Sequence, residues 1–130
     1  MLQLEIITPN GSVLDIEATR VTAPGEVGEF QVLSQHLPML TLLGGGRLSY
    51  ENDQGSGSIF LRGGVVEVSA QGHVLVLSDE VQLANDLDQE RAREIQSKAQ
   101  AGLAKSDYLS DSLLSDFQKD LAFAEAVLNA

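Results

Sequence analysis

The stretch HVLVLSDEVQLANDLDQERAREIQSKA, residues 73–99, contains the point at which the hydrophobic pattern of the chain changes. It begins with a β-branched and aliphatic run at residues 74–77, which is typical of a buried strand. After Ala84, apolar residues recur at steps of three and four among Ala, Glu, Gln and Lys, which is the period of an α-helix. The sequence therefore predicts two parts, a β domain over residues 1–84 and a helical part over residues 85–130.

Short apolar runs upstream of this change are separated by turn residues at roughly ten-residue intervals. Leu2, Leu4 and Ile6 alternate with polar residues, and aliphatic runs follow at residues 59–61 and 65–68. This spacing predicts an all-β sandwich, or flattened barrel, of eight or more short antiparallel strands. The breaks between the runs contain glycine and lie at residues 9–11, 24–25, 44–46, 54–57, 63–64 and 71–72.

Two of these glycine clusters resemble phosphate-binding loops only superficially. Residues 44–46 are followed by Arg47, without the Lys-Ser/Thr ending that such a loop needs, and residues 63–64 lie between two strand candidates. We expect turns or bulges at both places, where the backbone needs room.

The helical part predicts an antiparallel hairpin of two helices. Asp86, with Gln89 three residues later, is the predicted N-cap of a first helix from about Leu87 to Ala104. A second helix is expected from about Tyr108 to Leu128. Because the apolar stripes are narrow and rich in Ala, whose burial contributes little free energy, we expect the hairpin to be held only weakly on the β domain.

Composition excludes several classes of function. Nineteen acidic residues against eight basic ones give a net charge of −11, so the chain repels nucleic acid and anionic lipid and favours a basic partner. Cysteine is absent, which excludes disulfides, thiolate nucleophiles and Cys-ligated metals. No stretch approaches the roughly 18 apolar residues that span a bilayer, so we expect no direct membrane insertion.

Few residues could carry catalysis. The two histidines, His36 and His73, lie far apart in the sequence, so neither a metal site nor a metal cofactor is expected. A hydrolase could pair His36 with Ser34 or Glu29, but the sequence offers no orienting third group or oxyanion hole. We therefore predict a protein that is not an enzyme. A free-standing β-sandwich ligand-binding module with a helical lid is the alternative to a subunit of a larger assembly.

Several motifs, in order, make the chain similar to the epsilon subunit of F-type ATP synthases. The first is the Thr-Pro-turn segment at residues 8–11, and the second is Pro-Gly-x-x-Gly-Glu-Phe at residues 24–30. Leu-x-x-His-x-Pro follows at residues 33–38, and Gly-Gly-x-x-Glu-Val at residues 63–68. The pattern Leu-Asp-x-x-Arg-Ala stands at residues 87–92. The likeness covers essentially the whole chain and includes its order of β domain and helical hairpin.

The resemblance implies a non-catalytic rotor subunit that couples proton- or sodium-driven ring rotation to ATP synthesis. The β domain would bind the gamma subunit and the c-ring, with Glu29 at the c-ring contact and His36 at the gamma contact. The expected location is peripheral, on the cytoplasmic face of a bacterial inner membrane as part of the synthase, or at the equivalent place of an organelle-encoded enzyme.

The resemblance also implies a regulatory hairpin, which folds down on the sandwich or extends beside gamma to block hydrolysis at the catalytic beta subunits. Some bacterial members hold the folded state by binding ATP through the Leu-Asp-x-x-Arg-Ala pattern. Here the candidate ATP-binding residues are Leu87, Asp88, Arg91, Ala92 and Lys98, although Asp88 and Arg91 also fit an ordinary pair within a helix.

The second helix departs from the regulatory pattern. Lys119 is its only basic residue, among Asp111, Asp116, Asp120 and Glu125. Like-charge repulsion should weaken both phosphate binding and contact with an acidic part of beta. We therefore expect no cofactor beyond weak regulatory ATP, and weak inhibition.

Overall fold

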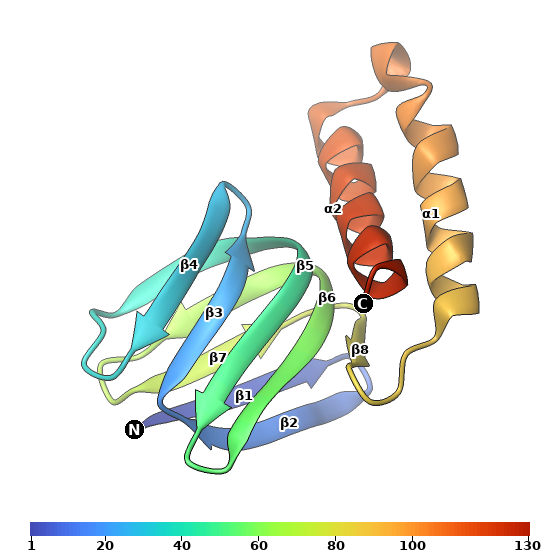
Figure 1. Cartoon of the computed structure of the whole chain (residues 1–130). Coiled ribbons are helices and arrows are strands. Elements are labelled where there is room, and N and C mark those ends of the chain that lie inside the picture. The colour runs from blue at the N-terminus through green and yellow to red at the C-terminus, as the bar shows by residue number, and fades with distance from the viewer.

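The computed structural model describes all 130 residues as a two-layer β sandwich with a helical hairpin at one side (Figure 1). The strands are β1 (Leu2–Thr8), β2 (Gly11–Ala18), β3 (Arg20–Gly25), β4 (Gly28–Leu33), β5 (Met39–Asn52), β6 (Gly55–Val68), β7 (His73–Leu77) and β8 (Val81–Leu83). The hairpin consists of α1 (Gln89–Leu103), a 3-10 turn (Ser106–Tyr108) and α2 (Asp111–Leu128).

The strand order is β2-β1-β7-β6-β5-β3-β4, with β8 paired to β6. The sandwich and the hairpin are confirmed, while the sheet remains open and does not close into a barrel. The prediction that all strands pair antiparallel is wrong at one place, because β1 and β7 are parallel. A tight turn sets β7 antiparallel to β6, and β1 then pairs with the free edge of β7 in the other direction.

The core lies between the two layers and follows the alternation seen in the sequence. Leu2, Leu4 and Ile6 on β1 are buried, as are Val74 and Val76 on β7. Because successive residues of a strand face opposite sides, the intervening residues face outward. The fifteen apolar residues of this core all lie between Leu2 and Val76, so the hairpin contributes none of them.

The two glycine clusters lie inside the 14-residue strands β5 and β6 and are not turns. The expected alternative, a bulge, fits the first cluster, because the register of β3 with β5 shifts between the pairs Thr22–Ser49 and Gly25–Leu43. Gly45 is paired with Arg62, whereas Gly44 and Gly63 are left out of the β5–β6 pairing. A Cβ atom on Gly45 would overlap the carbonyl oxygen of Lys119, and one on Gly63 would lie 3.1 Å from the Lys119 Cδ atom. The glycines therefore allow the backbone of α2 to approach β5 closely.

Both helices begin later than predicted. The N-cap of α1 is Asp88 and not Asp86, and its carboxylate accepts a hydrogen bond from the Arg91 amide at 2.9 Å. The Gln82 side chain binds the backbone of Asp88 at both N–H and C=O, which fixes this start. In α2 the N-cap is Ser110, so Tyr108 belongs to the preceding 3-10 turn. Neither helix is long and apolar enough to cross a membrane.

A second, smaller core joins the hairpin to the sheet. Phe123 is fully buried against the small side chains of α1, and Phe60 of β6 enters the same cluster. At Gly102, a Cβ atom would lie 2.5 Å from the Phe117 ring, so α1 and α2 also approach closely there. The Ala-rich stripe on α1 thus makes room for aromatic rings of α2. The cluster consists of Phe60, Ala92, Ile95, Phe123, Ala124 and Val127.

Ion pairs add to this contact. Arg62 of β6 binds Asp120 of α2 through two hydrogen bonds of 2.6 and 2.9 Å. Lys119 of α2 binds Glu26 of the β3–β4 turn at 3.1 Å. Glu80 binds Arg62 at 3.0 Å and Arg91 of α1 at 2.9 Å. Sequence analysis predicted a hairpin held weakly by Ala stripes and did not anticipate these pairs.

Replacing Gly45 by alanine should loosen the hairpin without disturbing the sandwich core. The added methyl group overlaps the α2 backbone, and such overpacking costs roughly 1–3 kcal/mol. Hydrogen exchange should show faster exchange for the amides of α2 and unchanged protection in β1 and β7.

Gly44→Ala is the matched control, because the three atoms nearest to a Cβ atom there belong to Gly25 and Glu26, at 3.3–3.8 Å, and none belongs to α2. Equal protection of α2 in Gly45→Ala and the wild type would contradict the close helix–strand contact.

Candidate protein-interaction site

A row of apolar side chains crosses the outer face of the sheet on four neighbouring strands. The strand register aligns Leu42 with Val65, Val65 with Leu77, and Leu77 with Ile7. We call these four residues the apolar row. Leu42 and Leu77 are 50% and 46% exposed. Contiguous apolar surface of this kind marks an interaction site more often than scattered exposed residues do.

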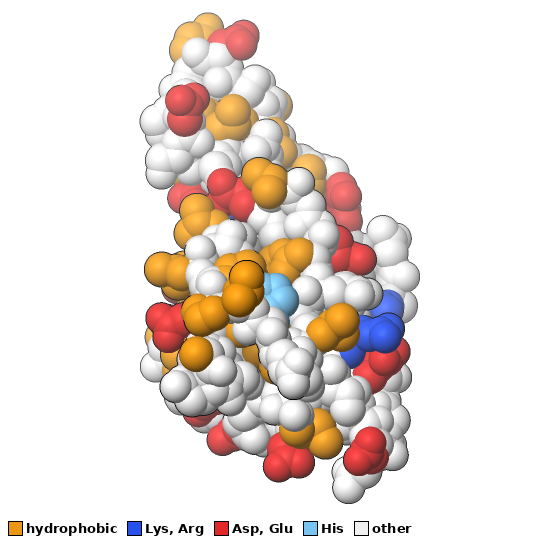
Figure 2. All heavy atoms as spheres, turned by 90° about the vertical axis from the view of Figure 1, so that its left-hand side faces the viewer, with side chains coloured by type: hydrophobic (Ala, Val, Ile, Leu, Met, Phe, Trp, Pro, Cys, Tyr) orange, Lys and Arg blue, Asp and Glu red, His pale blue; other side chains and the backbone are white.

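The apolar surface continues toward the β4–β5 loop. Leu40, one outward-facing position before Leu42, is 68% exposed, and Leu37 in the loop is 79% exposed. Figure 2, which views the left-hand side of Figure 1, shows hydrophobic side chains gathered on this face. His36 lies in the β4–β5 loop, half-buried, with its Nδ1 atom 2.6 Å from the Leu37 carbonyl oxygen. The loop thus holds the imidazole in place beside apolar surface.

Glu29 lies at the opposite end of β4, where the β3–β4 turn projects from the sandwich (Figure 1). Its side chain is exposed and forms no ion pair, and the neighbouring Val27 is fully exposed. The turn is anchored to α2, because Glu26 binds Lys119. This arrangement presents an unpaired carboxylate on a fixed turn.

The structure does not bring Glu29 and His36 together. The strand from Glu29 to Leu33 alone spans roughly 13 Å at 3.3 Å per residue, and His36 follows it. A catalytic dyad needs hydrogen-bond contact, so these two residues do not form one. No group of three or more His, Asp or Glu side chains could hold a metal ion.

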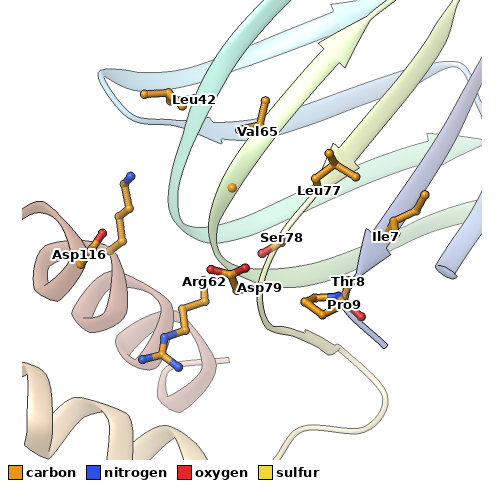
Figure 3. Close-up of a pocket in the computed structure, with 12 residues that line it drawn as sticks. Ile7, Thr8, Pro9, Leu42, Arg62, Val65, Leu77, Ser78, Asp79 and Asp116 are labelled. Atoms are coloured by element: carbon orange, nitrogen blue, oxygen red, sulfur yellow. The ribbon is translucent and has the colours of Figure 1, made fainter. Parts of the chain in front are cut away.

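A groove of about 560 Å³ lies where the apolar row meets the hairpin (Figure 3). Leu42, Val65 and Leu77 line its sheet side. Asp116 and Lys119 reach it from α2, so both domains contribute to its walls. The groove also contacts the segment after β7, where Ser78 is buried and donates a hydrogen bond to the Gly63 carbonyl oxygen at 2.6 Å.

The candidate ATP-binding residues all have structural contacts in the docked hairpin. Asp88 caps α1, Arg91 binds Glu80, and Lys98 lies 3.4 Å from Glu94. Ala92 is buried in the hairpin core, and Leu87 packs against the same core. The polar groups expected to meet a nucleotide are therefore paired within the chain.

The ion pairs change the pKa values of three groups. The pKa of Arg62 is raised, mainly by its hydrogen bonds to Asp120, while burial opposes the shift. Burial acts to raise the pKa of Glu80, but the hydrogen bonds and charges of Arg91 and Arg62 outweigh it and lower that pKa. The hydrogen bond to Glu80 is the largest cause of the raised pKa of Arg91. Glu80 is therefore a carboxylate stabilised by two guanidinium groups.

Sequence reasoning missed Arg62, Glu80 and Asp120 because nothing in their spacing relates them. Arg62 and Asp120 are 58 residues apart, and only the folding of α2 onto β6 brings them into contact. The one available signal was the acidic character of the second helix, which was interpreted as repulsive.

Comparisons with known proteins agree with the architecture. The family model described as "ATP synthase, Delta/Epsilon chain, beta-sandwich domain" matches residues 1–84. The "ATP synthase epsilon chain" of Nitratidesulfovibrio vulgaris (strain DP4) is 40% identical over 104 residues, which is 80% of this chain and 77% of the relative. The protein of the same name from Trichlorobacter lovleyi is 38% identical over 104 residues, 80% of this chain and 75% of the relative.

Two solved structures share the fold. A chain of the Euglena gracilis mitochondrial ATP synthase, OSCP/F1/c-ring, matches with a TM-score of 0.73 at 21% identity, covering 98% of this chain and 79% of that one. A chain of the Tetrahymena thermophila mitochondrial ATP synthase central stalk and c-ring matches with a TM-score of 0.61 at 18% identity, covering 97% and 96%. The family model matches the β domain, and the two relatives, 40% and 38% identical, are both epsilon chains. The chain therefore belongs to the family of ATP synthase epsilon chains.

Proposed function

We propose that this chain is a non-catalytic rotor subunit in the central stalk of an F-type ATP synthase, where it helps to couple ring rotation to ATP synthesis. Its family and the names of its relatives support this role. The observation that carries it in the structure is the apolar row, a contiguous and partly exposed apolar surface on four neighbouring strands. The family match over the sandwich favours a stalk subunit over a free-standing ligand-binding module.

The apolar row and His36 form the gamma contact in this proposal. Full burial of a Leu side chain contributes about 1.5–3 kcal/mol, and Leu42 and Leu77 are already half-covered. Each would therefore contribute roughly 1 kcal/mol on association. A polar partner would leave this gain unrealised, so the row suits an apolar surface of gamma.

Glu29 forms the c-ring contact. It projects from a turn that Lys119 holds through Glu26, and its carboxylate has no partner within the chain. A fixed, unpaired acid in a chain of net charge −11 suits a basic loop of the ring. Through these contacts the subunit would be peripheral, on the cytoplasmic face of a bacterial membrane or at the organelle equivalent.

The hairpin is the regulatory element of the proposal, and the structure has it docked on the sheet. An extended hairpin would reach the catalytic beta subunits, but α2 offers them only one basic residue, Lys119. That residue already binds Glu26 in the docked state. Weak inhibition follows, because extension gives up the Lys119 pair and presents an acidic helix.

Two variants should separate the two assembly contacts. Leu42→Asp places a charge on the apolar row and should weaken binding to the isolated gamma subunit at least tenfold, with His36→Ala causing a smaller loss. Glu29→Gln should leave gamma binding unchanged and weaken binding of the gamma complex to the c-ring. Co-purification and titration with gamma, with and without the ring, measure both effects.

Each variant is the control for the other, and Leu113→Asp on the exposed side of α2 controls for an added charge. Wild-type gamma affinity in Leu42→Asp would refute the proposed docking face. A free-standing binding module would show no affinity for gamma in any variant.

ATP should bind the isolated full-length chain weakly or not at all. Arg91 would have to leave Glu80, and the nearby carboxylates Glu80 and Asp120 repel phosphate. Isothermal calorimetry should show no binding heat at micromolar ATP, whereas a micromolar dissociation constant would refute this expectation. Glu94→Gln, which frees Lys98 and leaves Arg91 bound to Glu80, tests whether Lys98 alone suffices, and we expect no gain.

The docked hairpin should loosen in acid. Because the pKa of Glu80 is lowered in the folded chain, its stabilising contribution is fully present above its usual value of 4.5 and is lost as pH falls through the lowered pKa. Amide exchange of α2 relative to β7 between pH 7 and pH 3 should rise about tenfold beyond the intrinsic change.

Glu80→Gln should weaken docking at pH 7 and flatten this acid dependence, while Glu90→Gln, an exposed acid of α1 outside the ion pairs, should behave as the wild type. An identical profile for both variants would assign the acid response to other carboxylates.

A further inference from the structure

The groove between the apolar row and α2 has walls from both domains, and two of its carboxylates are unpaired. Asp79 belongs to the segment between β7 and β8, and Asp116 belongs to α2. Both side chains are exposed, and neither forms a hydrogen bond or ion pair within the chain. Figure 3 shows them at the groove, together with Leu42, Val65 and Leu77 on the strands.

The two cations of the groove are already neutralised. Arg62 binds Asp120 and Glu80, and Lys119 binds Glu26. Because Arg62 and Lys119 are paired, Asp79 and Asp116 are the uncompensated charges of the groove lining, so the groove favours a cation over phosphate and other anions. The groove thus has an uncovered apolar surface on its sheet side, and the carboxylates of Asp79 and Asp116 have no partner within the chain.

The backbone that carries each acid is fixed. On one side, Asp79 lies between Ser78, whose hydroxyl binds the Gly63 carbonyl oxygen, and Glu80, which binds Arg62. On the other side, the turn of α2 that follows Asp116 is held by the Lys119 and Asp120 ion pairs. Two fixed acids reduce the ordering cost that a bound cation would meet.

We propose that this groove binds an apolar protein segment carrying one lysine or arginine, whose apolar side chain covers the apolar row while its cation lies between Asp79 and Asp116. The inference rests on the proposed function, in which the gamma subunit supplies that segment. One acid comes from the sandwich and the other from the hairpin. The segment therefore binds the docked form more tightly than the undocked form, and gamma binding and hairpin docking stabilise each other.

The test is a titration of the full-length chain with gamma. Asp116→Asn and Asp79→Asn should each weaken binding about three- to tenfold, which is the range for a partly exposed charge pair. Glu125→Gln removes one charge from the exposed side of α2, outside the groove, and should change the affinity less than twofold.

A double-mutant cycle tests the involvement of the hairpin. Gly45→Ala displaces α2 and should weaken gamma binding to a similar extent as Asp116→Asn. Adding Asp116→Asn to Gly45→Ala should cause no further loss, because the acid has already left the groove. Gamma should also slow the exchange of α2 amides in the wild type and have little effect in Asp116→Asn.

The outcomes separate this inference from the proposed function. If Asp116→Asn binds like Glu125→Gln while Leu42→Asp loses affinity, gamma docks on the row without the groove and the inference fails alone. If Leu42→Asp also binds as the wild type, the proposed docking face fails. Concentration-dependent dimerisation of the isolated chain that Leu42→Asp abolishes would assign the groove to a second copy and overturn the inference.

Discussion

The close approach of the α2 backbone to strand β5 at Gly45 is the constraint on which the rest of the structure depends. Side chains normally separate a helix from a sheet, but here the Lys119 carbonyl oxygen occupies the place of a Cβ atom. This approach brings Asp120 within hydrogen-bond distance of Arg62 and buries Phe123 beside Phe60. Dispersion and charge-assisted hydrogen bonds act only at such short range, so both depend on the absence of a side chain at one position.

The same constraint divides the outer face of the sheet. The half that carries Gly45, Phe60 and Arg62 is covered by the hairpin, and the half that carries the apolar row is left free. A partner on the free half therefore lies beside α2. In the proposed function, assembly and hairpin position are then coupled by adjacency, without a conformational change passing through the sandwich core.

The sequence predicted the sandwich, the hairpin and the approximate place where one gives way to the other, because alternation along β1 and helical steps after Ala84 are local patterns. It did not predict the parallel pairing of β1 with β7 or the long strands around Gly45, which depend on elements distant in the sequence. Glu29 and His36 were selected by motif, yet only the fold separates them to opposite ends of β4. The apolar row joins four strands, so no linear pattern could reveal it.

The acidic character of α2 acquires a different meaning in the folded chain. Taken alone, an acidic helix predicts repulsion of other acidic groups. In the folded chain, however, Asp120 forms an ion pair with the partly buried Arg62, and Lys119 forms one with Glu26. Undocking would leave Arg62 with Glu80 alone and would expose Phe60 and Phe123 to water. An extended hairpin must therefore find another apolar contact for Phe123, since its charges favour the docked form. Any regulation by this hairpin depends on whether the partner's apolar surface outweighs the contact at β6.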